Sequence, residues 1–128
     1  MRERATVVCR RGPRVLLVAR DGRRWSLPGG ALKRQEAASS AARRELYEQT
    51  TINAPAVSYL FAFGGLNKRH HVFEITVDRF TKPKPSNEIR CCGWFHWRSV
   101  KRLNTSLPSR YIVELAFGQC SGGPMRGR

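Results

Sequence analysis

The chain has 128 residues, of which 41% are hydrophobic and 26% are charged. A length and composition of this kind fit one folded domain and exclude a disordered polypeptide. The 24 lysines and arginines outnumber the 9 acidic residues and give a net charge of +15, which attracts polyanions such as phosphorylated compounds. Because the arginines are scattered, a basic surface without any dedicated partner is an equal alternative.

The cysteines stand at positions 9, 91, 92 and 120 without a C-x-x-C pair, so we expect reduced thiols. No apolar leader follows the first residues, and the apolar runs are far shorter than the roughly 18 to 20 residues of a membrane span. These features predict a cytoplasmic protein without a membrane segment.

The first half of the chain alternates short apolar runs with turn residues. Residues 5–9 and 15–19 are β-branched and aliphatic and predict a β-hairpin. Trp25 begins a short extended piece that ends in a Pro-Gly-Gly loop at residues 28–30. Residues 38–49 contain no glycine or proline and have alanines at helical spacing, which predicts a helix after that loop.

The second half contains more strands and one more helix. Residues 57–63, 71–77 and 88–97 are aromatic and β-branched and predict strands, and Pro108 is well placed to begin a helix that continues to residue 117. This order predicts a single mixed α/β (α+β) domain over residues 1–117. We expect the Gly- and Arg-containing residues 118–128 to form a mobile tail.

The predicted helix places three oxygen-bearing side chains on one face. Glu45, Glu48 and Gln49 are three or four positions apart, so they fall within one third of the circumference. Two neighbouring carboxylates repel each other, and their presence is better explained by a shared cation or by full solvation. Oxygen ligands of this type suit Mg²⁺, with the phosphates of a substrate completing the coordination.

The segment from Gly30 to Ile52 resembles the Nudix box, G-x5-E-x7-R-E-U-x-E-E-x-G-U, where U is a bulky aliphatic residue. Seven of its nine defined positions match at the required spacing: Gly30, Glu36, Arg44, Glu45, Leu46, Glu48 and Ile52. A match of this length is a far more specific signal than a lone glycine motif. Two positions depart from the pattern, since Gln49 replaces a glutamate and Thr51 replaces a glycine.

The resemblance implies an alpha/beta/alpha sandwich with a mixed β-sheet that hydrolyses a nucleoside diphosphate linked to another moiety. It also implies that Glu45, Glu48 and the Gly29 carbonyl bind Mg²⁺, with Mn²⁺ as an alternative ion. Gln49 stands at a further ligand position, where its amide oxygen carries no charge. The resemblance further implies a salt bridge between Glu36 and Arg44, and these two residues complete the candidate catalytic set with Glu45 and Glu48.

Three further residues are candidates for the same site. Glu88 lies six residues before Trp94, a separation at which many family members have another metal ligand or base, although an ordinary loop carboxylate is nearly as good an interpretation. Arg20 is a candidate phosphate contact. Trp25 is a candidate contact at the rim of a nucleotide pocket, against an even chance that it only packs in the core.

Two other interpretations remain to be weighed against a metal-dependent hydrolase. A zinc site built from His70, His71, His96, Cys91 and Cys92 is disfavoured, because the spacing fits no zinc pattern and neighbouring strand residues point to opposite faces. A catalytically weakened relative that binds nucleotides or RNA through its basic surface is favoured by Gln49 and Thr51. The presence of Glu36, Arg44, Glu45 and Glu48 together favours the enzyme.

Overall fold

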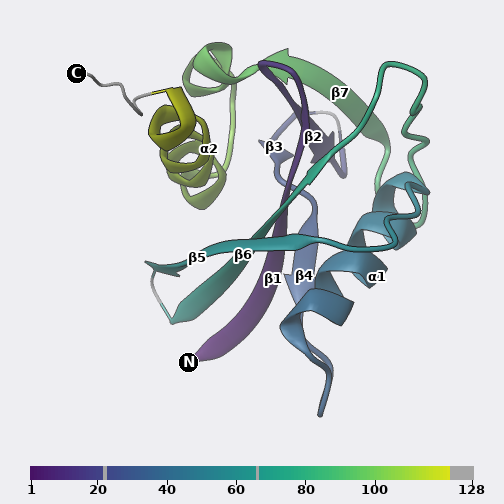
Figure 1. The fold of residues 1–128 in the computed structure, drawn as a ribbon, viewed down its shortest axis with the longest axis vertical. Helices are drawn as coiled ribbons and strands as arrows, with labels where there is room; N and C mark the ends of the chain where they lie inside the picture. Colours follow the sequence, from purple (N-terminus) through teal and green to yellow (C-terminus); the bar gives the residue numbers. More distant parts are fainter. Residues whose placement is uncertain (22, 66, 122–128) are drawn as a thin grey trace.

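A mixed β-sheet forms the centre of the computed structural model, with one α-helix on each face (Figure 1). The structure describes residues 1–21, 23–65 and 67–121, and of residues 119–121 only the backbone. The described elements follow one another as β1 (Arg2–Arg11), β2 (Arg14–Ala19), β3 (Trp25–Ser26), β4 (Gly29–Ala31), α1 (Ala38–Thr50), β5 (Ser58–Gly65), β6 (Lys68–Thr76), β7 (Cys91–His96), the 3-10 helix η1 (Trp97–Arg102) and α2 (Leu107–Ser121).

Strand β1 is the central strand of the sheet. The strand order is β3-β2-β1-β6-β5, and in addition β4 pairs with β1 and β7 pairs with β2. The pairing of β1 with β6 is parallel, whereas the other pairings are antiparallel, so the sheet is mixed as expected. In the hairpin of β1 and β2, Arg11 pairs with Arg14 across a turn in which Gly12 adopts a φ of 57°.

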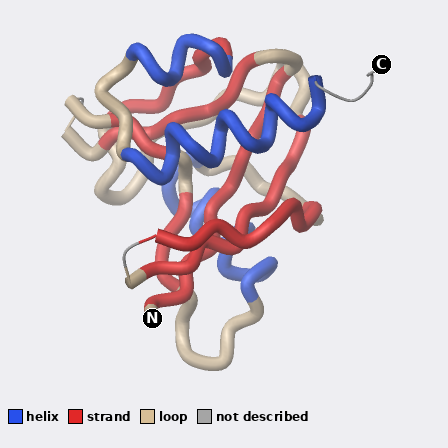
Figure 2. Tube along the Cα trace, turned by 90° about the vertical axis from the view of Figure 1, so that its left-hand side faces the viewer, coloured by secondary structure: helices blue, strands red, loops and turns tan. Residues whose placement is uncertain are grey.

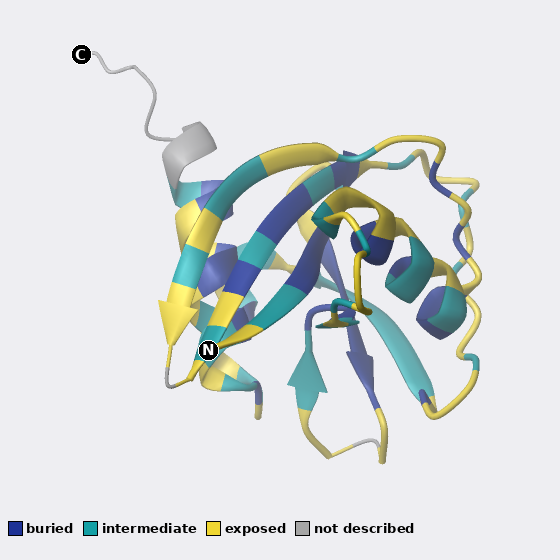
Figure 3. Ribbon diagram, turned by 90° about the horizontal axis from the view of Figure 1, so that it is seen from below, coloured by how far each residue is buried: buried dark blue, intermediate teal, exposed yellow. Residues whose placement is uncertain are grey.

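Alternating residues of β1 face two separate apolar layers. Val7 and Cys9 pack with Leu46 and the alanines of α1 on one face. Val8 packs with Ile112 and Val113 of α2 on the other. This division follows from the period-2 geometry of a strand, which sends neighbouring side chains to opposite faces. Figure 2 shows α2 crossing the strands on the near side with α1 behind them, and Figure 3 shows the exposed outer strand β5.

Several boundaries differ from the predictions, and the strand predicted at residues 88–97 is the shorter β7, because Trp97 begins η1. The Pro-Gly-Gly segment is not only a loop, because Gly29 to Ala31 form strand β4 and pair with β1 in the register Thr6 with Gly29 and Arg4 with Ala31. Helix α2 continues to Ser121, so the first residues of the predicted tail are helical, and residues 122–128 lie outside the described residues. Within the described part, no helix is long and apolar enough to cross a membrane.

Candidate active site

Two glycines allow β4 to lie between β1 and α1. A Cβ atom on Gly29 would collide with the carbonyl oxygen of Ala5 in β1, and one on Gly30 would collide with the carboxylate of Glu45 in α1. Only glycine leaves room for backbone and side chains to approach so closely on both sides. The Pro-Gly-Gly segment is therefore held directly against the second half of α1, at Glu45 and Gln49.

Arg44 connects the carboxylates of this region. Its guanidinium donates from Nε to Glu36 Oε2 at 2.8 Å and from Nη2 to Glu36 Oε1 at 3.0 Å, which is the bidentate geometry that arginine favours. Its Nη1 donates to Glu45 Oε2 at 3.0 Å and to Glu48 Oε1 at 3.3 Å. The hydrogen bond from Arg44 lowers the pKa of Glu36 to about 2, and the same contact raises the pKa of Arg44. The predicted salt bridge between Glu36 and Arg44 is present in the structure.

Gln49 is buried, and both the oxygen and the nitrogen of its amide form hydrogen bonds. Its Oε1 accepts a hydrogen bond from the Gly29 backbone N–H at 3.3 Å. Its Nε2 donates to the Gly29 carbonyl at 2.9 Å and to Glu45 Oε1 at 3.0 Å. The side chain is 3% exposed, so these contacts are made away from solvent. The amide nitrogen, and not the amide oxygen, therefore faces two of the predicted metal ligands.

The end of α1 keeps a left-handed residue although the sequence offers no glycine there. Thr51 has φ 61° and ψ 7°, and its N–H donates to the Tyr47 carbonyl at 2.8 Å. Its hydroxyl donates to the Thr50 carbonyl at 2.6 Å, which compensates part of the conformational cost. The threonine that replaces the glycine of the pattern therefore sits in a strained turn.

The carboxylates of α1 fit the divalent metal that the resemblance implies, but position 49 does not add to them. Glu45 Oε2 and Glu48 Oε1 both lie within 3.3 Å of the same nitrogen, Arg44 Nη1, so the two side chains converge. Converging anionic oxygens are what Mg²⁺ and Mn²⁺ prefer. Within the described ranges, however, no group of three or more His, Cys, Asp or Glu side chains is arranged to hold a metal. This holds for the histidines and cysteines of the disfavoured zinc site as well.

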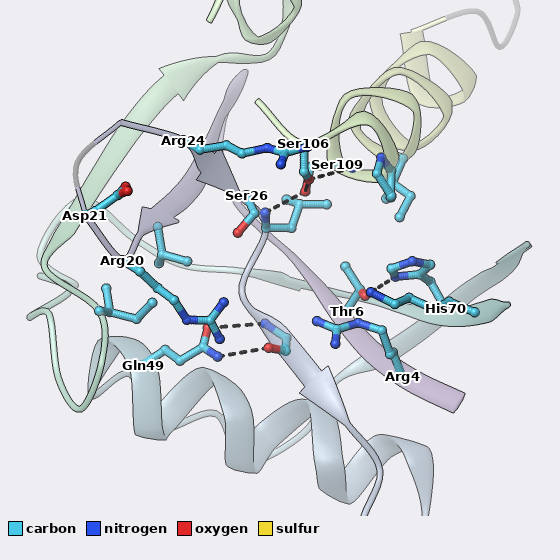
Figure 4. A pocket seen from close by; sticks show the side chains of 17 residues that line it. Arg4, Thr6, Arg20, Asp21, Arg24, Ser26, Gln49, His70, Ser106 and Ser109 are labelled. Carbon is cyan, nitrogen blue, oxygen red and sulfur yellow. Dashed lines mark hydrogen bonds between the residues drawn. The ribbon is translucent and has the colours of Figure 1, made fainter. Parts of the chain in front are cut away.

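A cavity of about 520 Å³ opens beside Gly29 and Gln49 (Figure 4). Its walls come from β1, β6, the segment after β2, the segment between β3 and β4, and the first turns of α2. Four basic side chains and one acidic side chain line it: Arg4, Arg20, Arg24, Lys68 and Asp21. Its volume is that of a pocket for a small organic ligand, and its charge is suited to an anionic one.

His70 forms part of the cavity wall as a neutral imidazole. Its Nδ1 lies 2.9 Å from the Thr6 hydroxyl, and among the described residues its Nε2 has no hydrogen-bond partner. Burial lowers the pKa of His70 to about 4, and the charges of Arg4 and Lys68 act in the same direction. The cavity therefore combines fixed positive charge with one uncharged polar ring.

The structure places the predicted site residues at three locations. Gly29, Gln49 and Arg20 line the cavity. Arg44, Glu45 and Glu48 of α1 form a network with Glu36 of the preceding loop. Glu88 lies beside the cavity, where it pairs with Arg20 at 3.8 Å and is 54% exposed. Trp25 is not part of the cavity wall; its ring packs edge-on against Phe95, with ring centroids 4.9 Å apart.

The sequence interpretation missed several residues of the cavity wall, among them Arg4, Arg24, Lys68 and His70. Arg4 and Thr6 occupy the same face of β1 as the buried Val8, and His70 occupies the same face of β6 as the buried Val72. A polar residue at an alternate position of a strand whose neighbours are buried is the signal that could have identified them.

The comparisons with known proteins agree with this geometry. A family model described as the NUDIX domain matches residues 1–116. The Bacillus subtilis (strain 168) protein YtkD, whose name gives a proposed 8-oxo-dGTP diphosphatase activity, is 36% identical over 94 residues, which is 70% of this chain but only 60% of YtkD.

Solved structures show the same fold. A nudix family protein from Chromobacterium violaceum has a TM-score of 0.82 at 25% identity, covering 98% of this chain and 82% of that chain. A bifunctional NMN adenylyltransferase/ADP ribose pyrophosphatase from Francisella tularensis, crystallised with AMP and a Mn ion, has a TM-score of 0.78 at 19% identity, covering 93% of this chain and 42% of that chain. Because the family model covers all but the last residues, the chain belongs to the NUDIX domain family.

Proposed function

We propose that this protein hydrolyses a phosphoric anhydride bond in a nucleoside diphosphate linked to another moiety. The observation that carries the proposal is the cavity, where four basic side chains, Arg4, Arg20, Arg24 and Lys68, stand against one carboxylate of the described lining, Asp21. A cavity of about 520 Å³ lies within the range of roughly 300 to 1,000 Å³ that small-molecule sites occupy. The similarity to YtkD and to a structure that holds AMP supports a nucleotide as the ligand.

Different residues of the chain would have different roles in the proposed reaction. The basic side chains of the cavity would bind and orient the phosphates and stabilise the negative charge that develops on their oxygens during transfer to water. Arg44 holds Glu45 and Glu48 in one orientation, so that both carboxylates are presented together. A Mg²⁺ or Mn²⁺ ion held by these two carboxylates would supply charge neutralisation and an activated water.

A substrate panel with matched variants tests this proposal. We expect hydrolysis of at least one nucleotide derivative in Mg²⁺ or Mn²⁺, and loss of hydrolysis in excess chelator. Glu48→Gln should lower the rate at least roughly 10-fold, because it removes one of two anionic ligands. Glu114→Gln makes the same exchange at an exposed position of α2 and should leave the rate unchanged. Hydrolysis that persists at full rate in chelator would contradict the metal requirement.

A second function is favoured by one specific observation, the hydrogen-bond donor that Gln49 presents at a predicted ligand position. In that case the protein is a weakened relative that binds nucleotides or RNA through its charge of +15. Filter binding of RNA should then decrease steeply between a low and a high salt concentration. Absence of RNA retention at low salt would remove the nucleic-acid role, and nucleotide binding without turnover across the panel would favour this second function over hydrolysis.

A further inference from the structure

The amide of Gln49 sits between two oxygen atoms that come from different elements. Its Nε2 donates one hydrogen bond to the Gly29 carbonyl of β4, at 2.9 Å, and another to Glu45 Oε1 of α1, at 3.0 Å. An amide nitrogen carries two hydrogens, so both are used. The amide oxygen faces the one donor present, the Gly29 N–H. Figure 4 shows the paired contacts with Gly29 as two parallel dashed lines.

A carboxylate at the same position could still accept from the Gly29 N–H, but it could not make the two contacts that need a donor. It would bring two acceptor oxygens next to the Gly29 carbonyl and the Glu45 carboxylate, in a place where the side chain is 3% exposed. Buried oxygens without a proton or a cation between them repel each other and lose their hydration. An arrangement with three acceptor groups therefore requires a proton or a cation between them, whereas the arrangement with Gln49 requires neither.

We infer that the Gln49 amide takes the place of a divalent cation in joining the Gly29 segment to α1. Glu45 is held on its other oxygen by Arg44 at 3.0 Å, so both of its oxygens already have partners. The junction of β4 and α1 is thus fully formed without metal. A metal that binds Glu45 and Glu48 must compete with these hydrogen bonds, and Gln49 acts as a positioning residue that lowers the affinity for it.

The inference concerns the metal of the proposed function, but its test needs no substrate, so a failure of hydrolysis leaves it intact. Melting temperatures are measured for the parent and for Gln49→Glu, each in chelator and in excess Mg²⁺ or Mn²⁺. The parent should melt at nearly the same temperature in both conditions. Gln49→Glu should melt at least roughly 5 °C lower in chelator, because a buried charge loses its partners, and should recover most of that loss in metal.

Two further variants separate this effect from general ones. Gln35→Glu adds the same charge at an exposed position and should change the melting temperature by no more than about 1 °C in either condition. Gln49→Met keeps the side-chain length but removes the donor, and it should lose stability that metal does not restore. Calorimetric titration with Mn²⁺ should give at least roughly 10-fold tighter binding to Gln49→Glu than to the parent.

Three results would overturn the inference. The first is a parent protein that gains as much stability from metal as Gln49→Glu does. The second is a Gln49→Glu protein that melts in chelator within about 1 °C of the parent. The third result is a Gln49→Met protein that melts at the same temperature as the parent, which would show that the amide does not join β4 to α1. This variant decides if Gln49→Glu does not fold in either condition.

Discussion

The two charged regions on either side of β4 differ in how their charges are balanced. On the α1 side, three carboxylates share one guanidinium, because Arg44 contacts Glu36 of the preceding loop as well as Glu45 and Glu48 of the helix. In the cavity, the cations have few internal partners, and among the described residues Arg4 and Lys68 form no ion pair. Charge that is paired inside the protein stabilises the fold, whereas charge left unpaired in a cavity is available to a ligand.

Removal of the shared cation, Arg44, should have the largest effect on stability. Arg44→Ala leaves Glu36 and Glu45, whose side chains are 14% and 15% exposed, without their main partner. The free energy of unfolding should fall by about 2 to 4 kcal/mol, since an unpaired, largely buried charge is costly. Urea unfolding at neutral pH measures this loss.

Arg34→Ala supplies the control for Arg44→Ala, because it removes an exposed arginine from the loop before α1. Its effect should stay within about 0.5 kcal/mol. An Arg44→Ala protein that is no less stable than this control would mean that the α1 network contributes as little as an ordinary surface ion pair.

Removal of cavity cations should instead leave stability nearly intact and weaken the binding of anions. Arg4→Gln and Lys68→Gln should each reduce the affinity for ADP roughly 10-fold, because each removes a charge-assisted contact to phosphate. Arg102→Gln makes the same change in net charge at an exposed position of η1 and tests for a general charge effect. Equal losses in all three variants, measured by calorimetry, would show that the cavity has no special role.

The smallest effect concerns backbone strain on the α1 side. Thr51→Gly relieves the positive φ of 61° but loses the hydroxyl contact to Thr50, so the free energy of unfolding should rise by only about 0.5 kcal/mol. Thr51→Ala keeps the Cβ atom and should bring no gain. If urea unfolding shows the two variants to be equally stable, the conformation of residue 51 is not a source of strain.

Much of the fold could be predicted because its signals are local. The helix of α1 follows from a run without glycine or proline, and the hairpin of β1 and β2 follows from two apolar runs around a turn. Strand β4 could not be predicted in this way. Glycines at residues 29 and 30 indicate a flexible loop, and they form a strand only because β1 supplies the partner.

The candidate site was predictable in its positions but not in its hydrogen bonds. The spacing of Glu45, Glu48 and Gln49 correctly places all three on neighbouring turns of α1. An amide has a donor end and an acceptor end, however, and the sequence does not say which end faces Glu45. The cavity cations were harder to predict from the sequence, because Arg4 and Lys68 lie on strands that meet only in the folded sheet.

The parallel pairing of β1 with β6 has a consequence for the kinetics of folding. Arg2 pairs with Lys68 and Arg10 with Thr76, so every contact along this central ladder closes a loop of more than sixty residues. Closing such a loop reduces the conformational entropy of the chain before the ladder can form. This loss favours slow folding on the millisecond-to-second scale. Val7 and Val8 lie on opposite faces of β1, which stay exposed until α1 covers the face of Val7 and α2 covers the face of Val8. The vulnerable period for aggregation during folding therefore lasts until the chain has been made and folded through α2.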